Sequence, residues 1–199
     1  MPPALAADHP ARPAPPRPAT AGFSIIELLV VVGLIAVVTG IAVLMMPGTV
    51  RSSKADSALT VLTGTLRKAR DRAVSERRDM EVRFVGTNEI DIYRWEVPSG
   101  TTLVSRTVLE DGARFLLYSA LPDTPDGFGK TSSVCFGSAT ALVFRSEGTF
   151  TDNNANLDPI SGTVFIGMDD DTVSGRAATI FGPTALVRGY RWDGRQWSE

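Results

Sequence analysis

The feature that most constrains this chain is an apolar run of 19 residues, from Leu28 to Met46, without a charged side chain. As an α-helix the run would be about 28 Å long, comparable with the hydrocarbon core of a bilayer. The sequence therefore predicts a membrane-spanning helix near the N-terminus. One carboxylate, Glu27, directly precedes the run. A charge at a membrane-helix end either lies at the interface or has a functional partner.

The segment before this helix, residues 1–21, has a composition of its own. It is rich in Pro and Ala, carries Arg12 and Arg17, and has no aliphatic side chain larger than Leu5. Such a segment cannot bury a core, so we expect it to be disordered or removed. The boundary at Gly22 precedes the apolar run, whereas ordinary signal cleavage follows it. The two arginines predict a cytoplasmic N-terminus and an exported C-terminal part.

Histidine and cysteine usage excludes several classes of enzyme. The one histidine, His9, lies in the N-terminal segment, so the rest of the chain has no Ser-His or Cys-His nucleophile and no His-ligated metal. The one cysteine, Cys135, cannot form an intrachain disulfide and has the flanks of a buried strand residue. The net charge is −2, and residues 1–21 contribute one net positive charge, so the rest of the chain, at −3, has no general attraction to nucleic acid. We predict a protein that is not an enzyme and needs no cofactor or metal.

The remaining periodicity predicts a long helix followed by a β domain. Pro47 and Gly48 suggest a kink or short break in the helix. Residues 49–78 then carry an apolar stripe at three- and four-residue steps. From Met80 the period changes to two, which indicates short strands separated by turns. The predicted strands are 81–85, 90–95, 102–109, 114–118, 134–136, 142–145, 163–166, 177–181 and 185–192, with loops at 121–133 and 151–161. The predicted fold class is α+β, a long N-terminal membrane-spanning helix packed on an antiparallel β domain.

The stretch Gly22-Phe23-Ser24-Ile25-Ile26-Glu27, with the apolar run after it, resembles the processing site of type IV pilins and type II secretion pseudopilins. The resemblance implies that prepilin peptidase removes a leader, residues 1–22, by cutting after Gly22, and that Phe23 is then N-methylated. It also implies that Glu27 is the assembly glutamate, which neutralises the terminal amine of a neighbouring subunit.

Further motifs resemble the GspH/FimT family of minor pseudopilins and pilins. They are the helix end at 66–78, the turn Phe144-Arg145-Ser146-Glu147-Gly148, and the strand pair 176–180 and 184–188. The resemblance implies a pilin-like fold, with a helix at 23–79, spanning the inner membrane once at 23–46, and a periplasmic β domain at 80–199. It implies a structural subunit at or near the tip of the type II secretion pseudopilus. Its partners would be other pseudopilins, the prepilin peptidase and inner-membrane lipid.

The C-terminal arginines leave an alternative function open. Arg188, Arg191 and Arg195 alternate with aromatic residues, a pattern that can bind DNA through phosphate contacts and stacking. Members of the FimT branch that take up DNA have a similar region with Gly-Arg-Val-Arg, where this chain has Ala-Leu-Val-Arg at 185–188. A strand with its aromatic face packed inward explains the pattern equally well, so we favour the secretion subunit over a DNA-binding minor pilin.

One acidic segment resembles a calcium loop. Oxygen-bearing side chains alternate between Asp152 and Asp158, but Leu157 replaces the glycine of an EF-hand and Thr163 its bidentate glutamate. We interpret the segment as a polar turn rather than a metal site.

Overall fold

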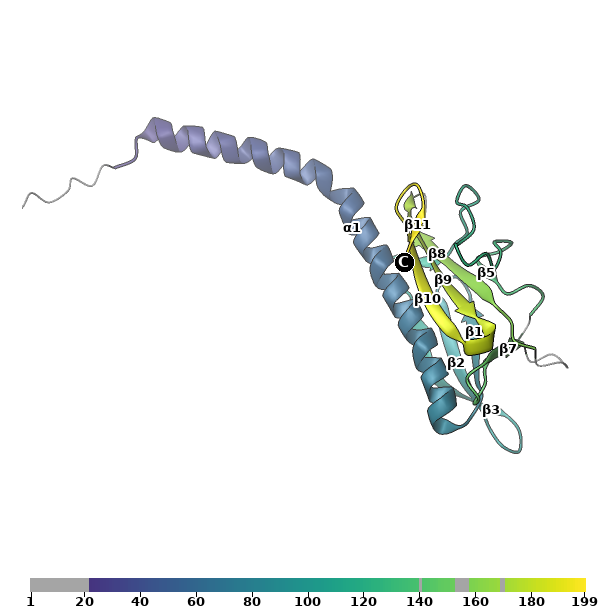
Figure 1. Ribbon diagram of the computed structural model, residues 1–199. Helices are drawn as coiled ribbons and strands as arrows, with labels where there is room; N and C mark the ends of the chain where they lie inside the picture. The colour runs from purple at the N-terminus through teal and green to yellow at the C-terminus, as the bar shows by residue number, and fades with distance from the viewer. Residues whose placement is uncertain (1–21, 140, 153–157, 169–170) are drawn as a thin grey trace, which may run out of the picture. The chain divides into compact units, whose positions relative to one another are not determined.

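The structure is a computed structural model of residues 1–199, and it describes residues 22–139, 141–152, 158–168 and 171–199, without the side chains of 42–49. The chain divides into two compact units, Met1–Leu44 and Met45–Glu199. Figure 1 shows the helix that runs through both and the strands of the second. The predicted leader, up to residue 21, lies outside the described residues.

Helix α1 extends without interruption from Ile25 to Glu76. Of the two alternatives predicted at Pro47 and Gly48, a kink or a short break, the break is therefore wrong, because a proline removes only one hydrogen bond and a long helix can continue past it. The kink stays a prediction. At its C-terminus Arg77 has a φ of 50° and the Arg78 N–H donates to the Ala73 carbonyl at 3.1 Å, a Schellman-type end. Among the described residues, no helix is long and apolar enough to cross a membrane.

Two antiparallel sheets make up the rest of the second unit. The first sheet has the order β3-β2-β1-β6-β7, and its strands are β1 (Met80–Val85), β2 (Glu89–Trp95), β3 (Thr101–Val108), β6 (Leu142–Phe144) and β7 (Phe150–Asp152). A bulge interrupts the pairing of β3 with β2, because Ile92 pairs with Ser105 but Tyr93 with Leu103.

The second sheet has the order β11-β10-β9-β8-β4, and β5 also pairs with β8. Its strands are β4 (Arg114–Phe115), β5 (Val134–Cys135), β8 (Gly162–Met168), β9 (Asp171–Phe181), β10 (Leu186–Trp192) and β11 (Trp197–Ser198), with a short 3-10 helix, η1 (Gly182–Thr184), between β9 and β10.

The main differences between the predicted and observed strands are four. Strand β7 lies partly in the predicted loop 151–161, β4 ends at Phe115, β11 was not predicted, and β9 begins at Asp171 rather than at residue 177. The early part of β9 contains Ser174 and Gly175, which have low strand propensity. Pairs with β8 lie on both sides of these two residues, Asp171 with Met168 and Arg176 with Ile166, and the register shifts between them.

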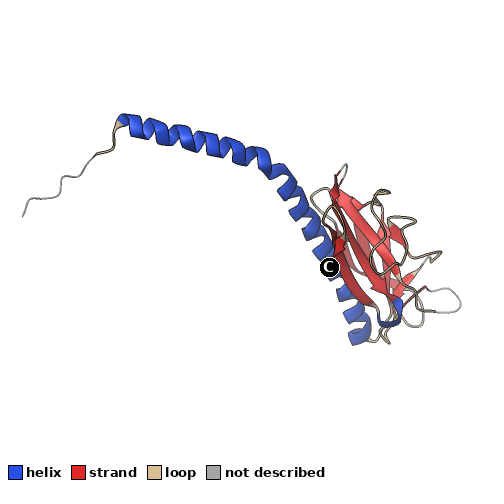
Figure 2. Ribbon diagram, turned by 45° about the horizontal axis from the view of Figure 1, so that its top comes forward, coloured by secondary structure: helices blue, strands red, loops and turns tan. Residues whose placement is uncertain are grey.

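The core lies between α1 and the sheets, and Figure 2 shows the C-terminal part of the helix against the strands. The predicted helix stripe is buried: Ala55, Ala58, Leu62, Leu66, Ala69 and Ala73. Burying a leucine fully, as at Leu62 and Leu66, contributes about 1.5–3 kcal/mol each. A second cluster forms around Phe165, Tyr190, Trp192 and Trp197. The predicted helix on an antiparallel β domain is confirmed, as is the burial of Cys135.

Candidate functional site

The predicted processing motif lies at the start of α1. Gly22, Phe23 and Ser24 precede the helix, and the Leu28 N–H donates to the Ser24 carbonyl at 3.1 Å, which closes the first turn. Glu27 lies in this first turn, where a carboxylate interacts favourably with the helix dipole. Phe23 and Glu27 are both exposed. No ion pair joins Glu27 to another of the described residues.

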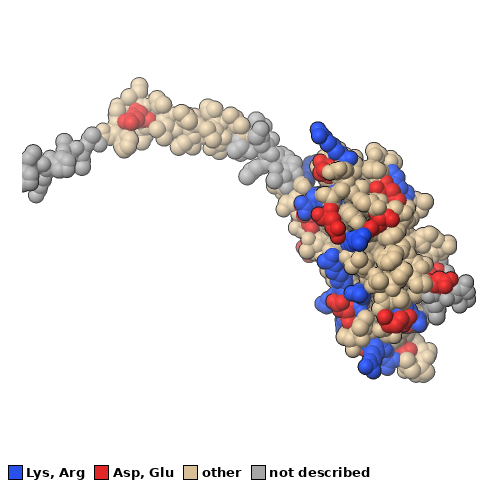
Figure 3. Space-filling view, in the orientation of Figure 1, with Lys and Arg blue, Asp and Glu red and all other residues tan. Residues whose placement is uncertain are grey.

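The helix after Glu27 is apolar on every side. Each large apolar side chain between Phe23 and Ile41 is 50–83% exposed. Figure 3 shows this part of α1 as an uncharged surface with acidic atoms near its beginning. A helix that is apolar all round is normally buried in protein or in a membrane. The predicted span 23–46 includes side chains outside the described set and stays a prediction.

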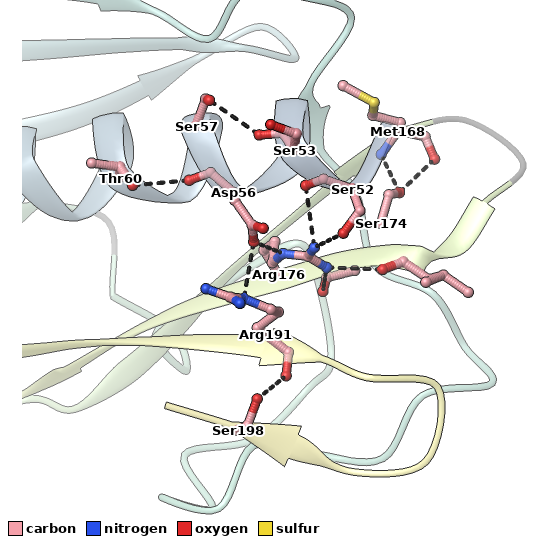
Figure 4. A network of polar contacts seen from close by, with 12 residues as sticks. Ser52, Ser53, Asp56, Ser57, Thr60, Met168, Ser174, Arg176, Arg191 and Ser198 are labelled. Atoms are coloured by element: carbon pink, nitrogen blue, oxygen red, sulfur yellow. Dashed lines mark hydrogen bonds and ion pairs between the residues drawn. The ribbon is translucent and has the colours of Figure 1, made fainter. Parts of the chain in front are cut away.

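A buried arginine joins α1 to the second sheet (Figure 4). Arg176 of β9 is 1% exposed, and its Nε lies 2.7 Å from Oδ1 of Asp56 on α1. Its Nη2 donates to Ser52 Oγ at 2.9 Å, and its Nη1 donates to the carbonyls of Val173 and Gly175, both at 2.8 Å. The guanidinium therefore fixes this part of the helix against β9.

The C-terminal arginines are held differently from one another. Arg188 Nη1 lies 2.7 Å from Asp126 Oδ1, and Arg191 Nε lies 3.0 Å from Asp56 Oδ1. Arg195 is exposed beyond β10. A hydrogen bond to Tyr190 and the charge of Asp126 raise the pKa of Arg188 above its usual value. Two of the three predicted DNA contacts thus form ion pairs with carboxylates of the same chain, and Arg191 shares its carboxylate, Asp56, with Arg176.

The aromatic residues among these arginines face inward. Tyr190, Trp192 and Trp197 are 5–9% exposed, and the two tryptophan rings meet edge to face at 5.4 Å. The interpretation of this segment as a strand with a packed aromatic face is confirmed, so these rings do not form an exposed stacking surface.

The turn at Phe144–Gly148 has a structural role. Arg145 Nη1 lies 3.0 Å from Asp79 Oδ2, and the Ser146 N–H donates to Asp79 Oδ1 at 2.9 Å. Gly148 closes the turn with a φ of 92°, a conformation that favours glycine. The motif therefore ties the β6–β7 hairpin to the segment that follows α1.

The calcium-like segment falls mostly outside the described residues, which omit 153–157. Its first residue, Asp152, belongs to β7, where Oδ1 accepts the Ala141 N–H at 3.1 Å. Over the described ranges, no group of three or more His, Cys, Asp or Glu side chains could hold a metal ion.

No role was predicted for Arg176 or Asp56. The small residues on both sides of Arg176 in its strand indicate that its side chain is buried, and a buried cation needs a partner of opposite charge. Nothing in the local pattern identifies an aspartate 120 positions earlier as that partner.

Comparison with known proteins supports the N-terminal assignment. Residues 17–43 match the family model described as the prokaryotic N-terminal methylation motif. No curated protein matches the chain. Two solved structures of the minor pseudopilin EpsH from the type II secretion system of Vibrio cholerae are similar to it. One is 14% identical with a TM-score of 0.45, covering 69% of this chain and 97% of EpsH. The other is 16% identical with a TM-score of 0.44, covering 69% and 94%.

TM-scores below 0.5 do not establish a common fold. The conclusion from these comparisons therefore rests on the family model alone. The chain contains a prokaryotic N-terminal methylation motif at the start of α1, as its sequence predicts.

Proposed function

We propose that this chain is a minor pseudopilin, a non-enzymatic structural subunit of a type II secretion pseudopilus. Prepilin peptidase removes residues 1–22 and Phe23 becomes the methylated N-terminus. Residues 23–46 hold the subunit in the inner membrane, with the β domain in the periplasm, before it joins other pseudopilins at or near the tip of the pseudopilus.

One observation carries the proposal: Glu27 is the charged residue in the first turn of α1, and the large side chains that follow it as far as Ile41 are apolar and exposed. Cleavage after Gly22 would place it fifth in the mature chain, inside the matched motif. The exposed helix needs lipid before assembly and neighbouring helices after it. In a bundle of such helices, Glu27 neutralises the terminal amine of a neighbour, and loss of one member of a buried charge pair costs about 3–5 kcal/mol.

The second unit supports a structural rather than a catalytic role. Its best-buried charged side chain, Arg176, is bonded to Asp56 and to backbone carbonyls, which leaves it no reactive function. The pairing of Arg188 and Arg191 with carboxylates likewise favours a secretion subunit over a DNA-binding pilin.

The test is a Glu27→Ala substitution, with Thr39→Ala in the same exposed apolar helix as the matched control. Both variants should insert and be processed, since removing a polar group makes the helix more apolar. Glu27→Ala should be depleted from sheared pseudopili, whereas Thr39→Ala should assemble normally. Equal incorporation of both would refute the assembly role.

Processing is tested separately with Gly22→Leu. This variant should accumulate as a precursor that is heavier, by intact mass, by the residues of the uncleaved leader. Complete maturation of the variant would contradict the assigned cleavage site while leaving the Glu27 test unaffected.

A further inference from the structure

The edge strand β3 differs from the other sheet edges among the described strands. The other edges are β7, β4, β5 and β11, which have two or three residues each, whereas β3 has eight. Over the described ranges β3 pairs only with β2. Natural edges are usually short or carry Lys or Pro to prevent pairing with another chain. Within β3 the one charged residue is Arg106, and its side chain is bonded back to Asp91 on β2.

A groove lies between this edge strand and α1. Its lining includes Gly64, Thr65 and Lys68 of α1, Ser105 and Thr107 of β3, and Ile92 of β2, and its volume is about 360 Å³. The Thr65 hydroxyl reaches the Thr107 hydroxyl at 3.5 Å, so helix and strand approach each other closely there. Because Gly64, Thr65, Ser105 and Thr107 have small side chains, apolar surface remains uncovered between the two elements.

The groove continues along the helix toward its N-terminal side. A second hollow of about 410 Å³ shares Val61 and Thr107 with the first and reaches Lys54 and Val108. Val61 and Val108 are 41% and 45% exposed. The hollow surface therefore follows the C-terminal half of β3, from Ser105 to Val108, where a ligand in extended conformation could lie beside it.

Among the charged side chains that line the groove, Lys68 differs from Lys54 and Arg72 in its ion pairing. Lys54 lies 3.4 Å from Asp111, and Arg72 lies 2.9 Å from Glu76. Lys68 is exposed in the lining, and no carboxylate of the described residues forms an ion pair with it. A ligand of this groove is therefore complementary if it places an acidic group opposite Lys68.

We propose that β3 accepts an extended segment of a partner protein as an added strand. The backbone of the segment bonds to the outer edge of β3, and alternate side chains enter the groove beside α1. An apolar side chain lies over Ile92 and an acidic one faces Lys68. The inference goes beyond the proposed function, since it concerns the β domain and does not depend on the N-terminal motif.

Two physical arguments select this occupant. A helix cannot bond to a row of strand N–H and C=O groups, because its own backbone bonds are internal. A second copy of β3 could pair with the edge, but its sequence Thr-Thr-Leu-Val-Ser-Arg-Thr-Val contains no acid for Lys68 and would add a second arginine.

The test uses the full chain in detergent micelles and a set of fluorescent eight-residue peptides. Each alternates valine and threonine and carries one glutamate, with the glutamate placed at each position in turn. Matched peptides carry lysine instead. Binding is measured by anisotropy, and hydrogen exchange locates the protected amides. At least one glutamate peptide should bind and protect β3 amides, and its lysine counterpart should bind at least tenfold more weakly.

Two variants examine the groove itself. Gly64→Leu fills it, and the fold should tolerate the change because a Cβ at this helical position meets no atom within 4 Å. Lys68→Glu reverses its charge. Each should weaken the glutamate peptide at least tenfold, whereas Val173→Leu, an exposed valine on β9, should leave binding unchanged. An unshifted melting temperature for Gly64→Leu verifies folding.

Three results would overturn the proposal. They are failure of every peptide to protect β3, unchanged binding by a folded Gly64→Leu variant, and sedimentation data showing that β3 instead joins two copies of this chain.

Discussion

The ion pair between Asp56 and Arg176 provides the sharpest test of how α1 is attached to the sheets. Replacing Asp56 with alanine leaves a guanidinium that is 1% exposed without its counter-charge. Removing one member of a fully buried pair costs about 3–5 kcal/mol. The Asp56 side chain is 34% exposed, so water already screens the pair, and we expect a loss of about 2–3 kcal/mol in the free energy of unfolding.

The measurement is urea unfolding of the full chain in a mild detergent, followed by tryptophan fluorescence. Trp192 and Trp197 report on the second sheet, to which Arg176 belongs. In the Asp56→Ala background, adding Arg176→Met should cause no further loss, because it removes the unpaired charge.

The matched control is Arg191→Ala, which removes the other cation paired with Asp56. Its side chain is 57% exposed, so the loss should be no more than about 0.5 kcal/mol. If Asp56→Ala costs no more than this control, or if the second substitution adds a full further loss, the burial argument is wrong.

Three further predictions follow from particular contacts. Arg77→Gly should stabilise the protein by about 0.5–1 kcal/mol in the same unfolding assay, because Arg77 has a φ of 50° at the helix end; a loss of stability would contradict this. The hydrogen bond from Arg106 lowers the pKa of Asp91, so its stabilising contribution is present above the unfolded pKa and is lost as pH falls through the lower folded pKa. Asp91→Asn should therefore make stability less dependent on pH between about 5 and 2, and an unchanged slope would contradict the linkage. Duplex DNA should bind weakly in fluorescence anisotropy at physiological salt, because carboxylates already pair with Arg188 and Arg191. Micromolar binding that Arg188→Ala and Arg191→Ala abolish would instead favour the DNA-binding alternative.

Local patterns were sufficient for the helix and for most strands. The stripe that includes Leu62 and Leu66 predicted which face of α1 is buried, because a three- and four-residue repeat places side chains on one side of a helix. The alternation after Met80 predicted β1 and β2 in the same way. Pattern reading failed for the start of β9, where Ser174 and Gly175 have little strand propensity and the register with β8 shifts between the Asp171–Met168 and Arg176–Ile166 pairs.

The N-terminal motif, the apolar helix with Glu27 at its beginning, and the α+β class could all be predicted from local sequence, since each depends on residues close together in the chain. The pairing of Arg176 with Asp56 and the groove between β3 and α1 became visible only in the folded chain. These features depend on contacts between distant segments. A sequence pattern indicates whether a side chain prefers burial, but the path of the chain determines which group it meets and which strand is left at an edge.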